Sequence, residues 1–115
     1  MALQYNPFDS AQRPGLTIDG TLLDSVTINT TGTWQGLYRV RPWSVTARGT
    51  FGGATVTIYI SDQLVKPLDT DILQAPFQIF TAPGSGSSQA AYRWIKAAVT
   101  GAGGGTLITV DLMGG

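Results

Sequence analysis

Side chains that could carry out chemistry are few in this chain of 115 residues. There is no His, no Cys and no Glu, and all seven acidic residues are Asp. Imidazole is the usual general base near neutral pH, and a Cys thiolate is both a strong nucleophile and a metal ligand. Because both groups are missing, the sequence predicts a protein that is not an enzyme.

Hydroxyl and carboxyl groups remain as candidates for catalysis. Ser85, Ser87 and Ser88 have no His to activate them, and a hydroxyl without a neighbouring base is a weak nucleophile. A pair of Asp carboxylates about 5 to 9.5 Å apart could hydrolyse a glycosidic bond, but seven Asp residues on one small domain include such a pair by chance. A small glycosidase is therefore a third-ranked hypothesis.

Two patterns could indicate a bound ion or cofactor. Asp62, Asp69 and Asp71 could hold Ca²⁺ together with backbone carbonyls, but their spacing is not that of an EF-hand, and Asp is also common in turns. The glycines of residues 101–105 are not followed by the Lys and Ser or Thr of a phosphate-binding loop. We expect no metal and no cofactor.

The charge balance excludes some partners. Seven basic residues offset the seven acids, so no basic field exists to hold phosphates, and we expect no nucleic-acid partner. Charged residues make up 12% of the chain, against about 25% in typical soluble domains, which favours association with other subunits. No apolar run predicts an export signal or a membrane span.

Residues 34–43 are the densest group of candidate binding residues. Two Trp, one Tyr and two Arg lie within ten residues: Trp34, Tyr38, Arg39, Arg41 and Trp43. These residue types are enriched at binding hot spots, because large flat rings bury area at low entropic cost and Arg adds a forked set of donors. The equal alternative is that the three aromatic residues fill the core.

A second candidate surface is formed by Tyr92 and Trp94, which share one face of an expected strand. Ile95 and Val99 share the other face with Ala97. If the Ile95 face packs inward, Tyr92 and Trp94 form an outward aromatic ledge that suits a neighbouring subunit or a sugar.

The first 14 residues are expected to form an extended arm, followed by one domain over residues 15–115. Leu3, Tyr5 and Phe8 are apolar but follow no strand period. An isolated domain would leave them in water, so we expect them to dock on a partner.

Apolar residues recur with a period of two, and turn residues interrupt the pattern every 8 to 12 positions, as in a sandwich or barrel. The pattern predicts a hairpin of residues 44–51 and 54–60 around Gly52-Gly53 and a second hairpin of residues 92–99 and 106–112. It also predicts weaker strands at 22–29 and 34–40, a connection over 62–76 that crosses between sheets, a short apolar run at 77–80 and a surface loop at 83–88.

The inward faces of these strands should build one core. We expect the inward side chains to be Val26 and Ile28, then Val45, Ala47, Gly49 and Phe51, then Ala54, Val56, Ile58 and Ile60, and finally Ile108, Val110 and Leu112. The predicted fold is an all-β, single-domain β-sandwich of seven to eight antiparallel strands with jelly-roll or Greek-key connections.

Two segments carry a resemblance to known proteins. Residues 43–62, which contain Gly-Thr-Phe-Gly-Gly-Ala-Thr-Val, and residues 92–101, Tyr-Arg-Trp-Ile-Lys-Ala-Ala-Val-Thr-Gly, resemble small structural proteins of tailed bacteriophages. Those proteins carry an Asp-Gly-Gly and Trp segment after the first hairpin, where this chain has Gln63-Leu-Val-Lys-Pro. The resemblance implies a virion β-sandwich that decorates or cements capsids, commonly as a trimer, or that belongs to a tail or fibre.

The leading hypothesis is a capsid decoration protein at the capsid surface of a virion assembled in the host cytoplasm. It would bridge neighbouring major capsid subunits. Its expected partners are the major capsid protein, copies of itself in a homotrimer, or both. The alternative hypothesis is a carbohydrate-binding or adaptor module of a phage tail or fibre.

Overall fold

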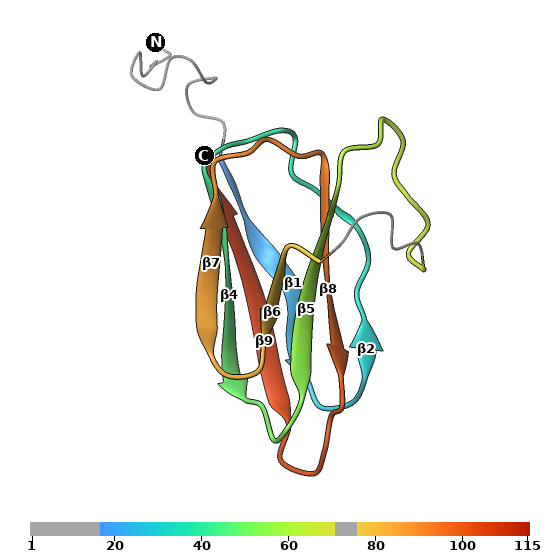
Figure 1. Ribbon diagram of the computed structural model, residues 1–115, viewed down its shortest axis with the longest axis vertical. Coiled ribbons are helices and arrows are strands. Elements are labelled where there is room, and N and C mark those ends of the chain that lie inside the picture. The colour runs from blue at the N-terminus through green and yellow to red at the C-terminus, as the bar shows by residue number, and fades with distance from the viewer. Residues whose placement is uncertain (1–16, 71–75) are drawn as a thin grey trace.

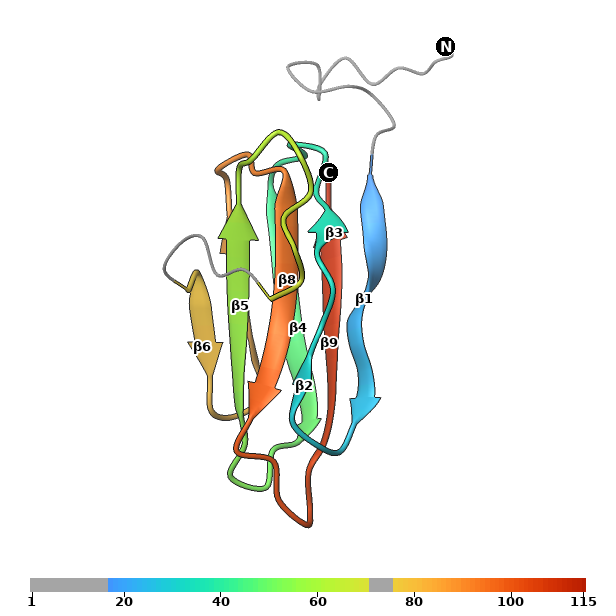
Figure 2. The same cartoon turned by 90° about the vertical axis from the view of Figure 1, so that its right-hand side faces the viewer.

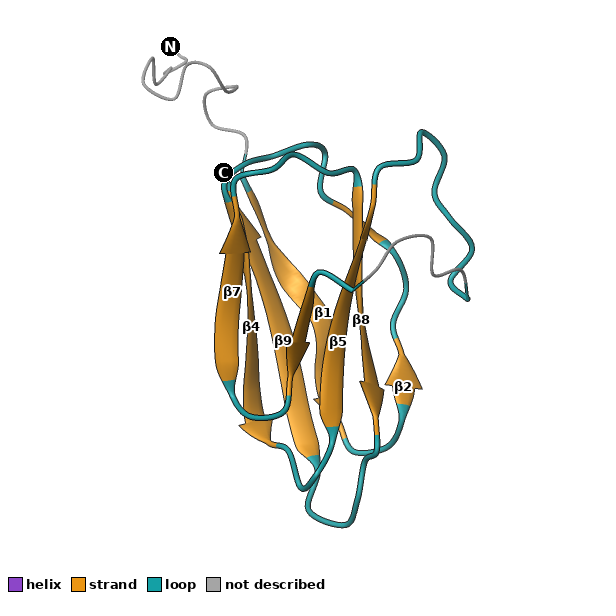
Figure 3. Cartoon of the chain, viewed as in Figure 1, coloured by secondary structure: helices purple, strands orange, loops and turns teal. Residues whose placement is uncertain are grey.

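The computed structural model describes residues 17–70 and 76–115, and these residues form strands and loops without a helix (Figure 3). The strands in this part of the chain are β1 (Ile18–Val26), β2 (Thr30–Thr31), β3 (Gln35–Gly36), β4 (Trp43–Thr50), β5 (Thr55–Ser61), β6 (Gln78–Phe80), β7 (Gly84–Ser88), β8 (Trp94–Thr100) and β9 (Leu107–Gly114). The expected arm, residues 1–14, lies outside the described residues.

The strands form two antiparallel sheets packed face to face (Figure 1). One sheet has the order β1-β9-β4-β7, and the other has the order β2-β8-β5-β6 with β3 also paired to β8. If β2 and β3 count as one interrupted strand, the first strand pairs with the last, the second with the second-last, and so on inward to β5 and β6. This nested pairing is that of a jelly roll, so the predicted all-β sandwich is confirmed.

Neither predicted hairpin is present, although the strands themselves are. β4 pairs with β7 and β9, whereas β5 pairs with β6 and β8 in the opposite sheet. β8 and β9 likewise belong to different sheets. Alternation along a strand shows that one face is buried, but it does not show whether the next strand lies beside it or across the core. Both glycine-rich turns therefore join the two sheets.

Other segments also differ from the prediction. The Gly and Ser residues of 84–88 form edge strand β7 instead of a loop, because β4 offers its free backbone groups to them. The connection after β5 returns to the same sheet at β6 and does not cross. Residues 34–40 form only the short β3, and Ile28 is exposed in the turn that follows β1.

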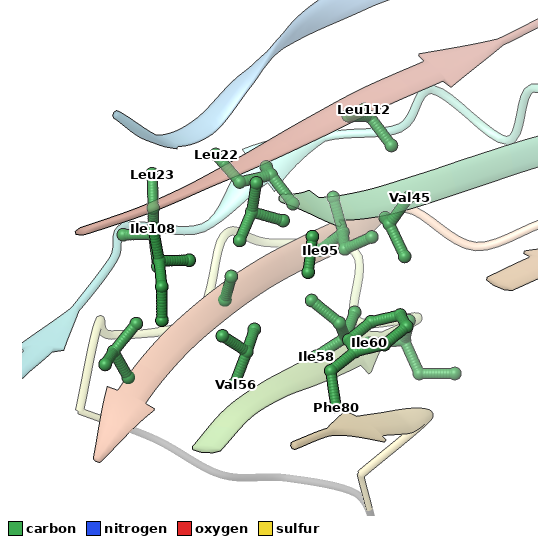
Figure 4. Packing of buried hydrophobic residues seen from close by; sticks show 14 of the residues in the cluster. Leu22, Leu23, Val45, Val56, Ile58, Ile60, Phe80, Ile95, Ile108 and Leu112 are labelled. Carbon is green, nitrogen blue, oxygen red and sulfur yellow. The ribbon is translucent and has the colours of Figure 1, made fainter. Parts of the chain in front are cut away.

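The core lies between the sheets, where apolar side chains from both meet (Figure 4). Its described members include Val45, Ala47 and Phe51 from β4 and the residue after it, Ala54, Val56, Ile58 and Ile60 along β5, and Ile108, Val110 and Leu112 from β9. These agree with the predicted inward positions, whereas Gly49, also predicted to face inward, is exposed at a positive φ of 110°. At about 25 cal/mol per Å² of apolar area, this burial is the main stabilising contribution.

Thr106 links the two glycine-rich turns, which lie side by side at the lower end of the sandwich (Figure 1). Its buried hydroxyl donates to the carbonyl oxygen of Phe51 at 2.8 Å and accepts from the N–H of Gly103 at 2.9 Å. Gly52 and Gly53 adopt positive φ angles of 57° and 86°, which glycine tolerates at little cost. The turns are thus fixed by one side chain and by backbone geometry.

The connection after β5 folds back over the outer face of its own sheet. Figure 2 shows this segment, which follows β5, running down across β8. It covers the side of β8 that faces away from the core, which brings it next to Trp34 and Lys96. The described part of this connection, residues 62–70, is called the β5 loop below.

Candidate binding surface

The two tryptophans at the ends of the 34–43 segment are buried, so the prediction that they form an exposed contact surface is wrong. Trp43 is only 1% exposed and begins β4 in the core. Its Nε1–H donates to the carbonyl oxygen of Ala90 at 2.9 Å, and its ring lies 4.8 Å from that of Phe77. This side chain fills the end of the sandwich, as the alternative interpretation proposed.

Trp34 is buried on the other side of its sheet. It is 2% exposed, and the β5 loop covers it. Its Nε1–H donates to the carbonyl oxygen of Leu68 at 2.9 Å, and its backbone N–H donates to Oδ1 of Asp69 at 3.2 Å. Trp34 therefore holds the loop in place.

Lys96 is the second anchor of the β5 loop, a role that no local sequence pattern indicates. The side chain lies on the outer face of β8 and is 1% exposed. Its ammonium group donates to the carbonyl oxygen of Asp69 and lies 4.8 Å from the ring centroid of Trp34 and 5.7 Å from that of Tyr59. A buried ammonium needs such partners, because removing the charge from water is costly.

The β5 loop presents apolar side chains to solvent. Leu64, Val65 and Leu68 are all exposed, whereas the loop backbone is bonded to the sheet. Its carbonyl groups accept from the side chains of Trp34, Trp94, Arg93 and Lys96. Because these bonds anchor the loop on the outer face of the sheet, the sheet separates the three apolar side chains from the core.

Tyr38 and Arg39 form an exposed turn with an unusual backbone. Their φ angles are 53° and 56°, in the left-handed region, and the N–H of Val40 donates to the carbonyl oxygen of Leu37 at 2.9 Å. This is the pattern of a type I′ turn, which normally contains Asn and Gly. Left-handed backbone costs about 1 to 2 kcal/mol for each non-glycine residue, and such strain is concentrated at functional sites.

Two further bonds hold the turn against the residues that directly precede β8. The N–H of Leu37 donates to the carbonyl oxygen of Arg93 at 2.8 Å, and the N–H of Arg39 donates to that of Tyr92 at 3.0 Å. The strained backbone is thus stabilised by the surrounding sheet. This turn places the Tyr38 side chain, which is 67% exposed, on the surface of the protein.

Gly36 supports the ring of Tyr38. A Cβ atom at this position would lie 2.9 Å from Cζ and 3.1 Å from Cε2 of the ring, which is closer than real side chains approach. The absence of a side chain therefore lets the ring lie against the backbone of β3.

Two arginines border the same surface and share one carboxylate. Nη1 of Arg39 lies 3.5 Å from Oδ1 of Asp62, and Nη1 of Arg93 lies 3.4 Å from the same oxygen. Arg93 Nη1 also donates to the carbonyl oxygen of Asp62 at 2.9 Å. The aspartate thus joins the two guanidinium groups at the start of the β5 loop.

These residues surround a shallow pocket of about 320 Å³. We call it the Tyr38 pocket, and its lining residues are Gly36, Tyr38, Arg39, Arg93 and Trp94. Tyr38 and Gly36 also line a second hollow of about 320 Å³ between β1 and β3. The ring of Tyr38 therefore separates two depressions in the surface.

The predicted aromatic ledge of Tyr92 and Trp94 does not form. Trp94 lies at the pocket, where its Nε1–H donates to the carbonyl oxygen of Gln63 at 2.9 Å. Tyr92 precedes β8 and packs against the core, with its ring 6.4 Å from that of Trp43 in an edge-on arrangement. Because β8 begins at Trp94, strand alternation does not extend to Tyr92, and the two rings lie on different parts of the molecule.

Among the predicted binding residues, the structure brings Tyr38, Arg39 and Trp94 together and adds Arg93 and Gly36. Arg41 is exposed in the same segment but does not line the pocket. Leu3, Tyr5 and Phe8 lie outside the described residues. The sequence did not predict Arg93 as a binding residue, because strand alternation places it on the face opposite Trp94. Only the pairing of β3 with β8 shows that it lies beside Arg39.

Two further findings concern metal ligands and membrane-spanning helices. Within residues 17–70 and 76–115, no group of three or more His, Cys, Asp or Glu side chains is arranged to hold a metal ion. Asp71, one of the residues considered for calcium, lies outside these ranges. The same part of the chain has no helix that is long and apolar enough to span a bilayer.

Comparisons with known proteins define the fold class. No protein-family model matches the chain, and no curated protein does. Among solved structures, it is similar to the crystal structure of the SPBc2 prophage-derived protein YomS, with a TM-score of 0.54 and 14% sequence identity. The match covers 86% of this chain and 92% of that chain. At this identity the similarity shows a shared fold.

Proposed function

We propose that this chain is a non-enzymatic structural protein of a bacteriophage virion that decorates the capsid and stabilises the head by bridging major capsid subunits. The prophage origin of the similar structure and the resemblance of residues 43–62 and 92–101 to phage structural proteins support the phage assignment. The absence of imidazole, thiol and Glu from the sequence supports a role in binding instead of catalysis.

The observation that carries this proposal is the exposed apolar surface of the β5 loop. Leu64, Val65 and Leu68 are exposed, and side chains of the sheet bind the carbonyl groups of residues 62, 63, 68 and 69 around them. A loop that is anchored in this way loses less entropy when a partner covers it than a free loop does. Each copy on a head would bury this area across a seam between capsid subunits, and repetition over the shell would add the small gains together.

The test is occupancy on heads that carry the chain. We expect Leu64→Ser combined with Leu68→Ser to lower the number of copies per major capsid protein at least severalfold. Leu107→Ser is the matched control, because Leu107 is an exposed apolar residue on the outer face of the other sheet. Undiminished occupancy of the double variant would contradict the role of the loop.

A second variant tests the arm, whose residues Leu3, Tyr5 and Phe8 were expected to contact a partner. Deletion of residues 1–10 should release the protein from heads if the arm contributes to bridging. The trimeric state that the resemblance implies is part of the proposal, and analytical ultracentrifugation of the purified chain measures it.

A second candidate function, a carbohydrate-binding or adaptor module of a phage tail or fibre, is favoured by Tyr38. An exposed ring fixed by a strained turn and supported by Gly36 is suited to stacking on a ligand. The copy number distinguishes the two locations. A ratio near one copy per major capsid protein supports the capsid, and a few copies per particle support a tail or fibre.

A further inference from the structure

We propose that the Tyr38 pocket binds a carboxylated sugar, such as a uronic acid residue of an acidic polysaccharide. This inference rests on the carbohydrate-binding function proposed above and adds the chemical class of the ligand. It does not depend on whether the protein belongs to the head or to the tail of the virion.

The charge around the pocket supports an anionic ligand. Arg39 and Arg93 share the single carboxylate of Asp62, so these three side chains together carry a formal charge of about +1. Arg41 adds a further positive charge in the same exposed segment. Because the whole chain has a formal net charge of zero, the charge of this group is a local excess of basic residues.

The hydrogen-bond donors support a carboxylate in particular. Each guanidinium has five N–H groups in a fork that matches two carboxylate oxygens. In both Arg39 and Arg93, the polar contacts within the described part of the chain are made by Nη1. A second carboxylate at the pocket could therefore accept from Nε and Nη2 of these side chains, while Asp62 keeps the two guanidinium groups close together.

The rings and the size of the pocket support a sugar as the bearer of this carboxylate. Tyr38 and Trp94 provide flat apolar surfaces beside the two arginines, and Gly36 lets the Tyr38 ring lie against β3. Such rings pack against the apolar C–H face of a pyranose, and the charged groups bind its substituents. A volume of about 320 Å³ lies at the lower end of the range for ligand pockets, about 300 to 1,000 Å³, which suits one sugar ring.

The probe is the trisaccharide of galacturonic acid, and its matched control is the same trisaccharide with the carboxyl groups reduced to alcohols. Binding is measured by calorimetry and by tryptophan fluorescence. Trp34 and Trp43 are buried, so a change in emission on binding reports Trp94. We expect the acid to bind at least about tenfold more tightly than the reduced form, because charge-assisted bonds to Arg are lost with the carboxylate.

Two variants identify the site. Arg39→Gln should weaken binding of the acid about tenfold and leave binding of the reduced form unchanged. Arg48→Gln is the control, since Arg48 is also exposed and paired with an aspartate, Asp111, but lies on the opposite sheet. It should leave both affinities as they are.

Each outcome decides a different claim. Equal binding of the acid and the reduced form would overturn the inference and keep the carbohydrate-binding function. Binding of neither form would overturn both. Equal or tighter binding of a sulfated trisaccharide would show that the pocket selects charge and not the carboxylate, which also contradicts the inference.

Discussion

The phenol ring of Tyr38 lies against Gly36, two residues earlier in the chain, with the hydroxyl oxygen 3.2 Å from where a Cβ of that glycine would be. The strained turn fixes one end of the tyrosine, and the bare backbone of β3 receives the other. An exposed ring is thereby placed against the backbone of β3.

Gly36→Ala should displace this ring and change the Tyr38 pocket. The clash falls on the far end of a flexible side chain, so we expect little change in the urea midpoint of unfolding, within about 0.5 kcal/mol. Binding of the uronic acid trisaccharide should fall severalfold. Gly20→Ala is the control, because nothing lies within 4 Å of a Cβ placed there. An unchanged affinity in Gly36→Ala would show that the ring position does not matter.

Arg39→Gly should make the protein more stable, although it removes an ion pair. The left-handed φ of 56° is strained for Arg and is natural for Gly. The exposed pair with Asp62 contributes little, so we expect a gain of about 0.5 to 1 kcal/mol in urea unfolding. Arg48→Gly, at a strand position without a positive φ, should lose about 0.5 to 1 kcal/mol. A loss of stability in Arg39→Gly would mean that the turn is not strained.

Trp34→Phe should loosen the β5 loop while leaving the core intact. The change removes the donor to Leu68 but keeps a ring under Lys96. The free energy of unfolding should fall by about 1 kcal/mol, and chymotrypsin should cleave faster at the loop leucines. Trp43→Phe removes an equivalent bond, to Ala90, at the end of the core. Faster cleavage of the loop in that variant as well would argue against a local anchor.

Thr106→Val should destabilise the protein through the two turns at once. It removes the donor to the carbonyl of Phe51, which keeps the N–H of Ala54 at 2.9 Å, and the acceptor of the exposed N–H of Gly103. Because the net contribution of a hydrogen bond is about 0.5 to 1.5 kcal/mol, we expect a loss of about 1 to 2 kcal/mol in chemical denaturation. Thr46→Val, on the exposed face of β4, should stay within about 0.5 kcal/mol of the original chain. Equal effects of the two changes would contradict the bridging role of Thr106.

The ion pair of Arg48 and Asp111 is a useful reference for the charged groups. Its bond is 2.7 Å long, and the hydrogen bond and the charge of Asp111 raise the pKa of Arg48 above its ordinary value. The arginine stays charged throughout the usual pH range, which makes it a constant control for the arginines at the pocket.

The candidate site could be predicted in part. The residue types of Tyr38, Arg39 and Trp94 predict binding residues, and the structure places all three at one pocket. Trp34 and Trp43 have the same types and are buried, so composition alone cannot separate a core ring from a surface ring. The anchoring role of Lys96 depends on a loop that returns over the sheet, and no local pattern indicates this.

By itself, the sequence determined that the chain forms strands around one core, because alternation of apolar and polar residues is a local property of an extended backbone. It also determined which faces of β4, β5 and β9 are buried. Only the tertiary structure decided that both glycine turns cross between the sheets and that Arg39 lies beside Arg93. Pairing of distant strands depends on the packing of the whole core, which no short stretch of sequence specifies.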